Sequence, residues 1–360
     1  LYAPVLSSEG EMSANIRKLV YFDTWIHPIA EEILNAAPGI EMIRLDQNDD
    51  EAHVFDVMKD AHGYQMLAKT ELQPRWWPDR AFMEKCPNLL AVASLGAGYD
   101  ACDDDAASEM GIMVINNSGA NSDSVAQHAI GMILALSKNM IRHDRMMRDA
   151  PGLDRMAYPG LETTGKTLGI VGLGQIGRRT AKIARHALGL NVIAYDPYIT
   201  VEDFVARDAE PVDFDTLFKT SDYISVHCPL TKETRGMIGA EAFAMMKPTA
   251  YFITTARGFI HDEAALADAL AAGQMDGAGV DVFDQEPPGP GHPLMQFQNV
   301  LMTPHAAGIT DVCSYNMAKW GAEQWIEVLN GRRPPRLVNP DCWPTYVERY
   351  TGIFGHPPSS

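Results

Sequence analysis

A six-residue turn constrains the fold of this chain more than any other feature of its sequence. Residues 172–177 are Gly-Leu-Gly-Gln-Ile-Gly, between the apolar run Thr167–Val171 and a helical pattern. Gly172 permits a tight turn, Gly174 leaves the backbone open to a ligand, and Gly177 lets the helix approach the strand. The N-terminus of such a helix offers N–H groups and a positive dipole end to phosphates. The turn therefore predicts a parallel α/β domain that binds a phosphate-containing ligand.

The next predicted strand, Asn191–Tyr195, ends at an acidic residue that defines the ligand more closely. Asp196 follows this strand, 19 residues after Gly177. A carboxylate at this spacing accepts hydrogen bonds from the ribose hydroxyls of a dinucleotide and repels a 2′-phosphate. Strand, turn, helix and acid together predict a dinucleotide-binding domain that prefers NAD to NADP.

Short β-rich runs alternate with helical patterns along the chain, which is typical of a parallel α/β sheet. The further runs predicted as strands are Lys18–Phe22, Leu89–Ser94, Tyr223–His227, Ala250–Thr254, Gly277–Phe283 and Val300–Thr303. The segments predicted as helices are Pro28–Asn35, 176–188, Glu263–Ala272, Val312–Asn330 and one long helix over Ser124–Arg142. We predict two α/β units connected by this long helix, and a Pro-rich tail after residue 330.

Composition excludes several classes of protein. The 360 residues suggest about two domains, and the net charge of −18 disfavours binding to nucleic acid. The longest apolar runs, such as Ala129–Leu136, have about eight residues, whereas a membrane span needs about 20. No basic segment followed by an apolar one precedes the first strand, and the five cysteines include no Cys-x-x-Cys pair. We therefore predict a cytoplasmic protein with reduced thiols, no membrane segment and no metal site.

Three polar residues come shortly after the last three predicted strands, namely Arg257, Glu286 and His305. Because ligands bind outside the carboxyl ends of the strands in a doubly wound sheet, we expect these side chains to converge on one crevice. Arg257 can bind a carboxylate and polarise the adjacent carbonyl. His305 can donate a proton to a developing alkoxide, and a neighbouring Glu286 would orient the ring and favour its protonated form. This set predicts hydride transfer to a 2-oxo acid.

Motifs distributed over about residues 18–345 point to one family. They are residues 165–174, His227–Thr231, Ala256–Gly258, Asp281–Phe283 with Glu286-Pro287, Thr303–His305 with Gly308, and Val338–Pro340. This set resembles the D-isomer-specific 2-hydroxyacid dehydrogenase family. The resemblance implies two doubly wound parallel-sheet α/β domains, a flavodoxin-like substrate-binding domain and a Rossmann NAD-binding domain, with a cleft between them. The substrate-binding domain would be discontinuous, with residues 13–120 and 309–360 on either side of an NAD-binding domain of residues 121–308.

The resemblance also implies roles for individual residues. Arg257, Glu286 and His305 match the catalytic residues of the family, with Arg257 binding the substrate carboxylate and carbonyl. Ala97 and Gly98 match a loop whose N–H groups hold the substrate carboxylate. The residues that match cofactor contacts are Gly172, Gly174, Gln175, Ile176, Gly177, Asp196, Cys228, Pro229, Thr255 and Asp281. The family implies NAD as cofactor, a 2-oxo acid and D-2-hydroxy acid as substrate pair, and a homodimer built partly by the long helix from Ser124.

Two other functions share this scaffold. Corepressor proteins that sense NAD and recruit peptides resemble it, including the three catalytic residues, but this sequence shows no long disordered tail or basic targeting run. Formate dehydrogenases have a similar fold with Gln in place of Glu286, and formate needs no proton shuttle. The sequence therefore favours an NAD-dependent D-2-hydroxyacid dehydrogenase over both alternatives.

Overall fold

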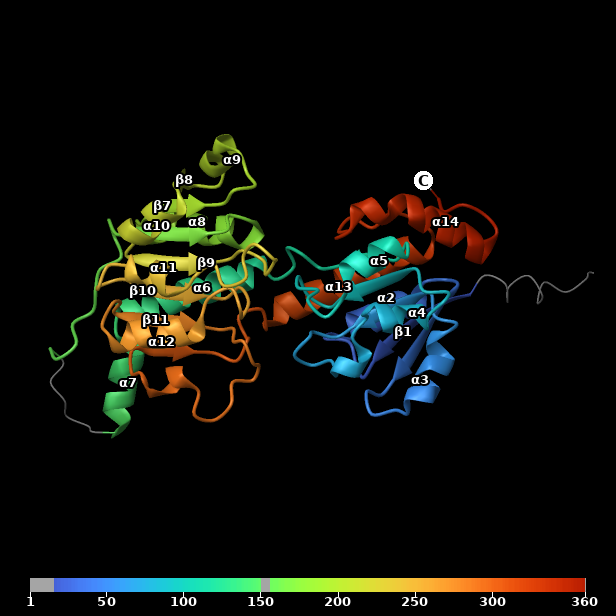
Figure 1. The fold of residues 1–360 in the computed structure, drawn as a ribbon, viewed down its shortest axis with the longest axis horizontal. Coiled ribbons are helices and arrows are strands. Elements are labelled where there is room, and N and C mark those ends of the chain that lie inside the picture. Colours follow the sequence, from blue (N-terminus) through green and yellow to red (C-terminus); the bar gives the residue numbers. More distant parts are fainter. Residues whose placement is uncertain (1–15, 150–155, 360) are drawn as a thin grey trace, which may run out of the picture. The chain divides into compact units, whose positions relative to one another are not determined.

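The computed structural model describes residues 16–149 and 156–359 (Figure 1). They divide into two compact units, of which the first contains the described residues up to Asn121 together with those from Asp311 onward. The second unit runs from Ser122 to Thr310. These boundaries lie within two residues of those expected after residues 120 and 308. The expected start at residue 13 lies outside the described residues.

The first unit is built on a five-stranded parallel sheet with the order β2-β1-β3-β4-β5. Its strands are β1 (Arg17–Phe22), β2 (Ile40–Leu45), β3 (Gly63–Met66), β4 (Ala91–Ser94) and β5 (Met113–Ile115). Its helices are α2 (Ile29–Ala36), α3 (Glu51–Met58), η2 (Pro74–Trp76), α4 (Arg80–Glu84), α5 (Asp104–Glu109), α13 (Asp311–Leu329), η4 (Pro340–Cys342) and α14 (Trp343–Phe354). This is the strand order of flavodoxin-like domains.

The second unit is built on a seven-stranded parallel sheet with the order β12-β11-β10-β9-β6-β7-β8. Its strands are β6 (Thr167–Val171), β7 (Asn191–Tyr195), β8 (Glu210–Pro211), β9 (Tyr223–Val226), β10 (Tyr251–Thr254), β11 (Gly277–Val280) and β12 (Val300–Met302). Its helices are α6 (Ser122–Ser137), α7 (Met140–Asp149), α8 (Gln175–Leu188), α9 (Val201–Ala206), α10 (Phe214–Thr220), α11 (Ala240–Ala244), α12 (Glu263–Ala271) and η3 (Pro293–Gln296). The strand order reverses between β6 and β9, which is where doubly wound sheets bind their ligands.

Both sheets are covered on both faces, which explains why their strands are apolar runs. In β10, Tyr251 and Ile253 pack into the apolar cluster that contains α6 and α8, whereas Phe252 packs into the cluster on the opposite face. In β1, Leu19 and Val20 likewise enter opposite clusters of the first unit. Successive side chains of a strand point to opposite faces, so the central strands of a sheet covered by helices are apolar on both faces. The predicted class, two parallel α/β domains, is confirmed.

Three details of the prediction were wrong. The long helix expected over Ser124–Arg142 is two helices, because Asn139 adopts a left-handed φ of 52° between α6 and α7. Asparagine accepts this conformation more readily than most residues. In the Pro-rich tail after residue 330 no helix was predicted, but it contains α14, with a proline in its first turn, where the missing N–H costs little. The apolar pattern of 176–188 places Ala187 on the buried face of its helix, but in α8 this residue is exposed and the buried face is centred on Thr180 and Ala184.

In the described part of the chain, the helices are too short or too polar to cross a lipid bilayer.

His261 is a buried titratable group in the apolar core of the second unit. Neither ring nitrogen has a hydrogen-bond partner among the described residues, and burial lowers the pKa of His261 to about 4. The ordinary value in an unfolded chain is about 6.5. Between these values the unfolded chain binds the additional proton, so the stability contributed by neutral His261 is complete above pH 6.5 and is lost as the pH falls toward 4.

We therefore expect His261→Leu to reduce the acid sensitivity of folding. Between pH 7.5 and 5.5 the wild-type chain should lose about 1 kcal/mol more unfolding free energy than the variant. Urea denaturation at the two pH values measures this difference. The exposed His53 provides the control, because His53→Gln should leave the wild-type pH dependence unchanged. Equal losses in wild type and His261→Leu would contradict the prediction.

Candidate active site

The glycine turn after β6 has the geometry that its sequence predicts. Gly172 has a φ of 89°, and a Cβ on it would lie 2.6 Å from the backbone nitrogen of Cys228. A Cβ on Gly177 would lie 2.2 Å from the carbonyl oxygen of Gly172. Neither position accepts a larger residue without moving backbone, so the close packing of α8 on the turn requires both glycines.

Gly174 has the opposite environment, because a Cβ on it would meet no protein atom within 4 Å. Gly174 is the N-cap residue of α8, and no side chain caps the helix there. In the described structure the N–H groups of Gln175, Ile176 and Gly177 donate to no protein acceptor. Open space, free N–H groups and the positive end of the helix dipole together form a site suited to a pyrophosphate.

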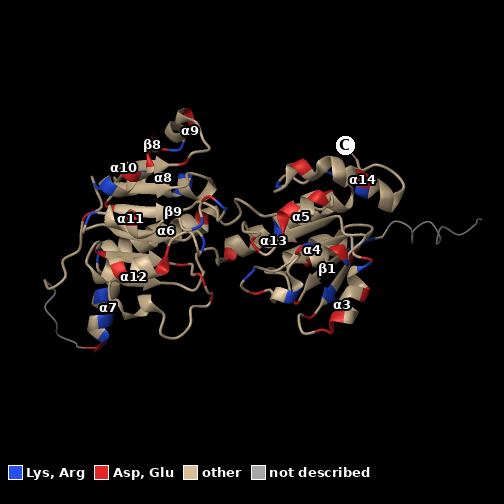
Figure 2. Ribbon diagram, in the orientation of Figure 1, with Lys and Arg blue, Asp and Glu red and all other residues tan. Residues whose placement is uncertain are grey.

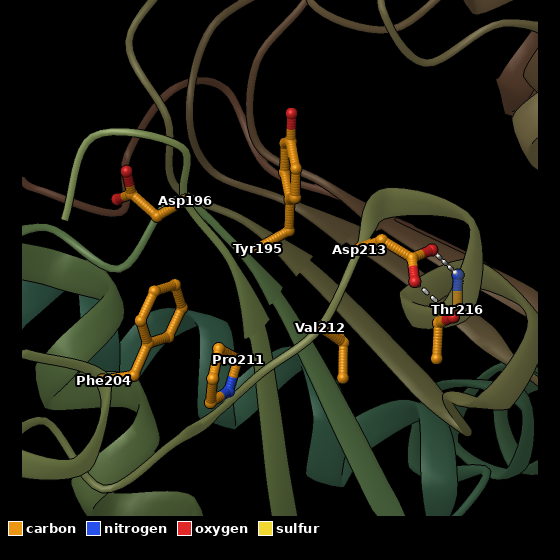
Figure 3. Close-up of a pocket in the computed structure, with 7 residues that line it drawn as sticks. All are labelled: Tyr195, Asp196, Phe204, Pro211, Val212, Asp213 and Thr216. Carbon is orange, nitrogen blue, oxygen red and sulfur yellow. Dashed lines mark hydrogen bonds between the residues drawn. The ribbon is translucent and has the colours of Figure 1, made fainter. Parts of the chain in front are cut away.

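Asp196 lies beside this turn at the end of β7. One carboxylate oxygen accepts from the N–H of Leu173 (2.9 Å) and the other from the N–H of Tyr198 (3.1 Å). These bonds fix the carboxylate and leave it lone pairs for ribose hydroxyls. A hollow of about 450 Å³ adjoins it and is lined by Tyr195, Asp196, Phe204, Pro211, Val212, Asp213 and Thr216 (Figure 3). Aromatic and aliphatic side chains beside an acid suit an adenosine moiety.

The segment after β9 packs against the turn at Gly172 and begins with uncharged side chains. Burial raises the pKa of the Cys228 thiol to about 12, so this cysteine is a neutral thiol. Burial lowers the pKa of His227 to about 3, and its Nε2 lies 2.9 Å from the hydroxyl of Ser225. The carbonyl of Pro229 accepts from the hydroxyl of Thr234 (2.7 Å), and the Thr255 hydroxyl lies 3.5 Å from His227 Nδ1. These side chains offer polar contacts without adding charge.

Glu286 and His305 are in direct contact. Nδ1 of His305 lies 2.7 Å from one carboxylate oxygen of Glu286, whose other oxygen accepts from the N–H of Phe283 (2.9 Å). The glutamate is thus held by its own loop while it orients the ring. The pairing occupies Nδ1 and leaves Nε2 as the ring nitrogen that can exchange a proton with a ligand.

The carboxylate of Asp281 shapes the turn that carries His305. This side chain is 1% exposed and accepts from the Thr303 hydroxyl (2.5 Å) and from the N–H groups of Ala306 (2.8 Å) and Ala307 (3.1 Å). His305 has a φ of 55°, a left-handed conformation that costs about 1–3 kcal/mol in a residue with a side chain. The hydrogen bonds of Asp281 therefore hold His305 in place, and the expected contact of Asp281 with a nicotinamide carboxamide stays a prediction.

Arg257 lies on the loop after β10, next to the loop of Glu286. Its Nη1 donates to the carbonyl of Ala256 (2.6 Å). A Cβ on Gly258 would lie 2.2 Å from the carbonyl oxygen of Phe283, so the two loops are in backbone contact. The structure thus shows the contact between Glu286 and His305 directly. Arg257 lies on the neighbouring loop, which leaves the same edge of the sheet.

In the first unit, the loop after β4 presents free N–H groups. The carbonyl of Ala97 accepts from the side-chain amide of Asn116 (2.8 Å), and the carbonyl of Gly98 accepts from the hydroxyl of Ser94. Over the described ranges, the N–H groups of Ala97 and Gly98 donate to no protein acceptor. A loop with fixed carbonyls and two open N–H groups is suited to an anion.

The sequence analysis missed the residues that hold these loops, including Ser94, Asn116 and Thr303. Each is a small polar residue at the end of a strand, where such residues are common, so residue type alone carried little signal. The partners of Asn116 and Thr303 are about 20 residues away and that of Ser94 lies across its own turn, so all three contacts became visible only in the folded structure.

Comparisons with known proteins identify the family and support the fold. The family model for the D-isomer-specific 2-hydroxyacid dehydrogenase NAD-binding domain matches residues 130–307. The glyoxylate reductase of Thermofilum pendens is 40% identical over 266 residues, which cover 72% of this chain and 78% of that protein. The D-3-phosphoglycerate dehydrogenase of Archaeoglobus fulgidus is 39% identical over 261 residues, covering 72% and 49%. The solved structure of Aquifex aeolicus D-lactate dehydrogenase with NAD and lactic acid has a TM-score of 0.76 at 26% identity, covering 89% and 99%.

The chain belongs to the D-isomer-specific 2-hydroxyacid dehydrogenase family, and residues 130–307 match its NAD-binding domain. It spans about half the length of the phosphoglycerate dehydrogenase it matches. The predicted family and the predicted NAD cofactor are confirmed.

Asp196 offers a test of cofactor selectivity. Asp196→Ala removes the charge and the ribose hydrogen bonds, and we expect the ratio of NADPH to NADH dissociation constants to fall about 10-fold. Fluorescence titration with both cofactors measures the ratio. Asp196→Asn keeps an acceptor for the Leu173 N–H and should give an intermediate ratio. A ratio unchanged from wild type in Asp196→Ala would remove this residue from the assigned role.

Proposed function

We propose that this protein is an NAD-dependent oxidoreductase that interconverts a small 2-oxo acid and the D-2-hydroxy acid. The observation that carries the proposal is the 2.7 Å contact between Glu286 and His305 at the carboxyl edge of the second sheet. Membership of the family, and relatives named glyoxylate reductase and D-3-phosphoglycerate dehydrogenase, support the same reaction class.

Each site residue would have its own role in the proposed reaction. NADH supplies a hydride when bound, and the open turn at Gly174 with Asp196 would hold its pyrophosphate and ribose. Arg257 would bind the substrate carboxylate with its planar guanidinium and polarise the neighbouring carbonyl. His305 would deliver a proton from Nε2 to the oxygen that becomes negative, and Glu286 would stabilise the imidazolium before transfer. In the oxidative direction, neutral His305 would accept the hydroxyl proton.

The loop after β4 in the first unit offers further donors. The open N–H groups of Ala97 and Gly98 would bind a substrate carboxylate, because the carbonyls of both residues are held by other partners. Under this proposal the first unit is the substrate-binding domain and the second is the NAD-binding domain.

Replacement of His305 tests the reaction. The wild-type protein should oxidise NADH with at least one of glyoxylate, hydroxypyruvate, pyruvate or a bulkier 2-oxo acid. His305→Gln should lower kcat by about 10²–10⁴-fold, as expected for loss of a general acid, and leave the NADH dissociation constant within about 2-fold. Absorbance at the NADH band and fluorescence titration measure the two quantities, and the exposed His186→Gln is the control.

The same assay separates the alternatives. Tight NADH binding without turnover of any 2-oxo acid would favour an NAD-sensing binding protein. Turnover of formate with NAD, unaffected by His305→Gln, would favour a formate dehydrogenase. Either result would contradict the proposed reaction.

We also propose that the protein is a cytoplasmic homodimer. The five free thiols are consistent with a reducing compartment. The helix α7 has no buried residue, and Met140 and Met147 on it are 54% and 60% exposed among arginines (Figure 2). A helix of ten residues is marginal in water without packing, so α7 is suited to be covered by a second copy of the chain.

Substitution on α7 tests this assembly. The pair Met140→Lys and Met147→Lys should weaken the dimer at least about 10-fold, because two apolar side chains would be replaced by like charges. Light scattering across a concentration series gives the dissociation constant. Val205→Lys, which changes a still more exposed apolar residue on α9, should leave the dimer intact. A wild-type monomer at all concentrations would contradict the proposal.

A further inference from the structure

The side chain of Glu263 contacts the loop after β11 directly and, through Asp284, is linked to the loop after β10. The proposed reaction uses both loops. Glu263 is the first residue of α12 and is 16% exposed. One carboxylate oxygen accepts from the backbone N–H of Asp284 (2.8 Å), and the other lies 3.1 Å from Nε2 of His292. Asp284 belongs to the loop of Glu286, so this carboxylate fixes that loop to the body of the domain.

The hydrogen bonds of His292 define its tautomer. Its Nδ1 accepts from the N–H of Leu294 (3.4 Å), at the start of η3. An accepting Nδ1 carries no proton, so the ring proton is on Nε2 and is donated to Glu263. Both oxygens of Glu263 therefore accept from fixed donors. His292 is 12% exposed, so water competes little for this contact.

The second loop is fixed through Asp284. Its carboxylate accepts from the N–H of Phe259 (2.5 Å). Phe259 is a bulky residue with a φ of 61°, its side chain is 42% exposed, and the guanidinium of Arg235 lies 4.9 Å from its ring centroid. Such a conformation persists only where neighbouring groups hold it. Burial raises the pKa of Asp284, and the Phe259 N–H acts in the opposite direction, as expected for a partly desolvated carboxylate with a fixed donor.

The spacing along the chain connects these contacts to the proposed chemistry. Phe259 follows Arg257 by two residues, and Asp284 precedes Glu286 by two residues. Between them, Gly258 packs directly on the carbonyl of Phe283. A displacement of Asp284 would therefore move both loops, and with them the guanidinium and the carboxylate that orients His305. The other titratable groups around Glu263 are Asp262 and His261, and neither accepts or donates to it.

We propose that Glu263 is a positioning residue that sets Arg257 and Glu286 relative to each other through Asp284, with His292 holding Glu263 in place. The inference rests on the proposed function for its kinetic consequences, but the arrangement of the loops can be measured without turnover. Glu263 touches neither substrate nor cofactor under this proposal. It acts through the hydrogen bonds Glu263–Asp284 and Asp284–Phe259.

Kinetics and NMR of Glu263 variants test the proposal. Glu263→Ala should lower kcat about 10-fold and raise KM for the 2-oxo acid, while KM for NADH and the NADH dissociation constant stay within about 2-fold. Glu263→Gln keeps an acceptor for the Asp284 N–H and should recover part of kcat. If Glu263→Ala only destabilised the fold, the melting temperature would fall, but KM for the 2-oxo acid would not rise separately from KM for NADH.

A second variant isolates the role of His292. His292→Asn keeps a side chain that can cap η3 at the Leu294 N–H, but it is too short to reach Glu263. It should resemble Glu263→Gln in kcat. The matched control is Asp268→Asn, which removes an exposed carboxylate from the same helix and should match wild type.

The NMR readout is independent of turnover. The ring signals of His305, assigned from the spectrum of His305→Gln, and the guanidinium signals of Arg257 should shift in Glu263→Gln and His292→Asn but not in Asp268→Asn. If the protein reduces no 2-oxo acid, the proposed function is contradicted. The spectra would still show whether Glu263 positions Arg257 and His305. Kinetics and spectra of Glu263→Gln and His292→Asn equal to those of Asp268→Asn would overturn the inference, whether or not Glu263→Ala folds.

Discussion

In a parallel sheet every strand ends at the same edge, and the proposed site in the second unit depends on this constraint. The turn after β6, Asp196 after β7, and the loops after β10, β11 and β12 all leave that edge. Because the strand order reverses between β6 and β9, the first helix departs to one face and the later connections to the other. Residues separated by more than a hundred positions can therefore contact the same ligand, because the parallel sheet already brings their strand ends together.

Buried carboxylates give these loops their shape. Asp281 accepts three donors from the turn of His305, and Glu263 accepts two donors, from Asp284 and His292, in the segment between β11 and η3. A buried carboxylate is costly unless its oxygens are satisfied, so each carboxylate tolerates only a narrow range of loop conformations. This explains how His305 and Phe259 are kept at positive φ values. Strain in the turns is offset by hydrogen bonds to groups that do not react.

The sequence predicted an element correctly where a short stretch of residues signals it, and missed an element where no such stretch exists. The strands β6 and β7 were predicted with their observed bounds, because each is an apolar run bordered by a glycine turn or an acid. The strands β2, β3, β5 and β8 were missed, since β2 is half-exposed, β3 begins with the poor strand former Gly63, and β5 and β8 have only three and two residues. The division of the predicted helix at Asn139 depends on a single left-handed residue, which hydrophobic periodicity does not report.

The sequence by itself determined the fold class, the glycine turn of the NAD-binding domain and the identity of the polar residues at the strand ends, because apolar runs, glycines and acids at fixed spacing report local geometry. Only the tertiary structure decided which of these residues meet. The pairing of Glu286 with His305, the three bonds of Asp281 and the link from Glu263 to both loops join strand-end segments that the intervening helices α12 and η3 separate in sequence. Contacts of that kind depend on the register and order of strands, which a linear pattern of residue types does not specify.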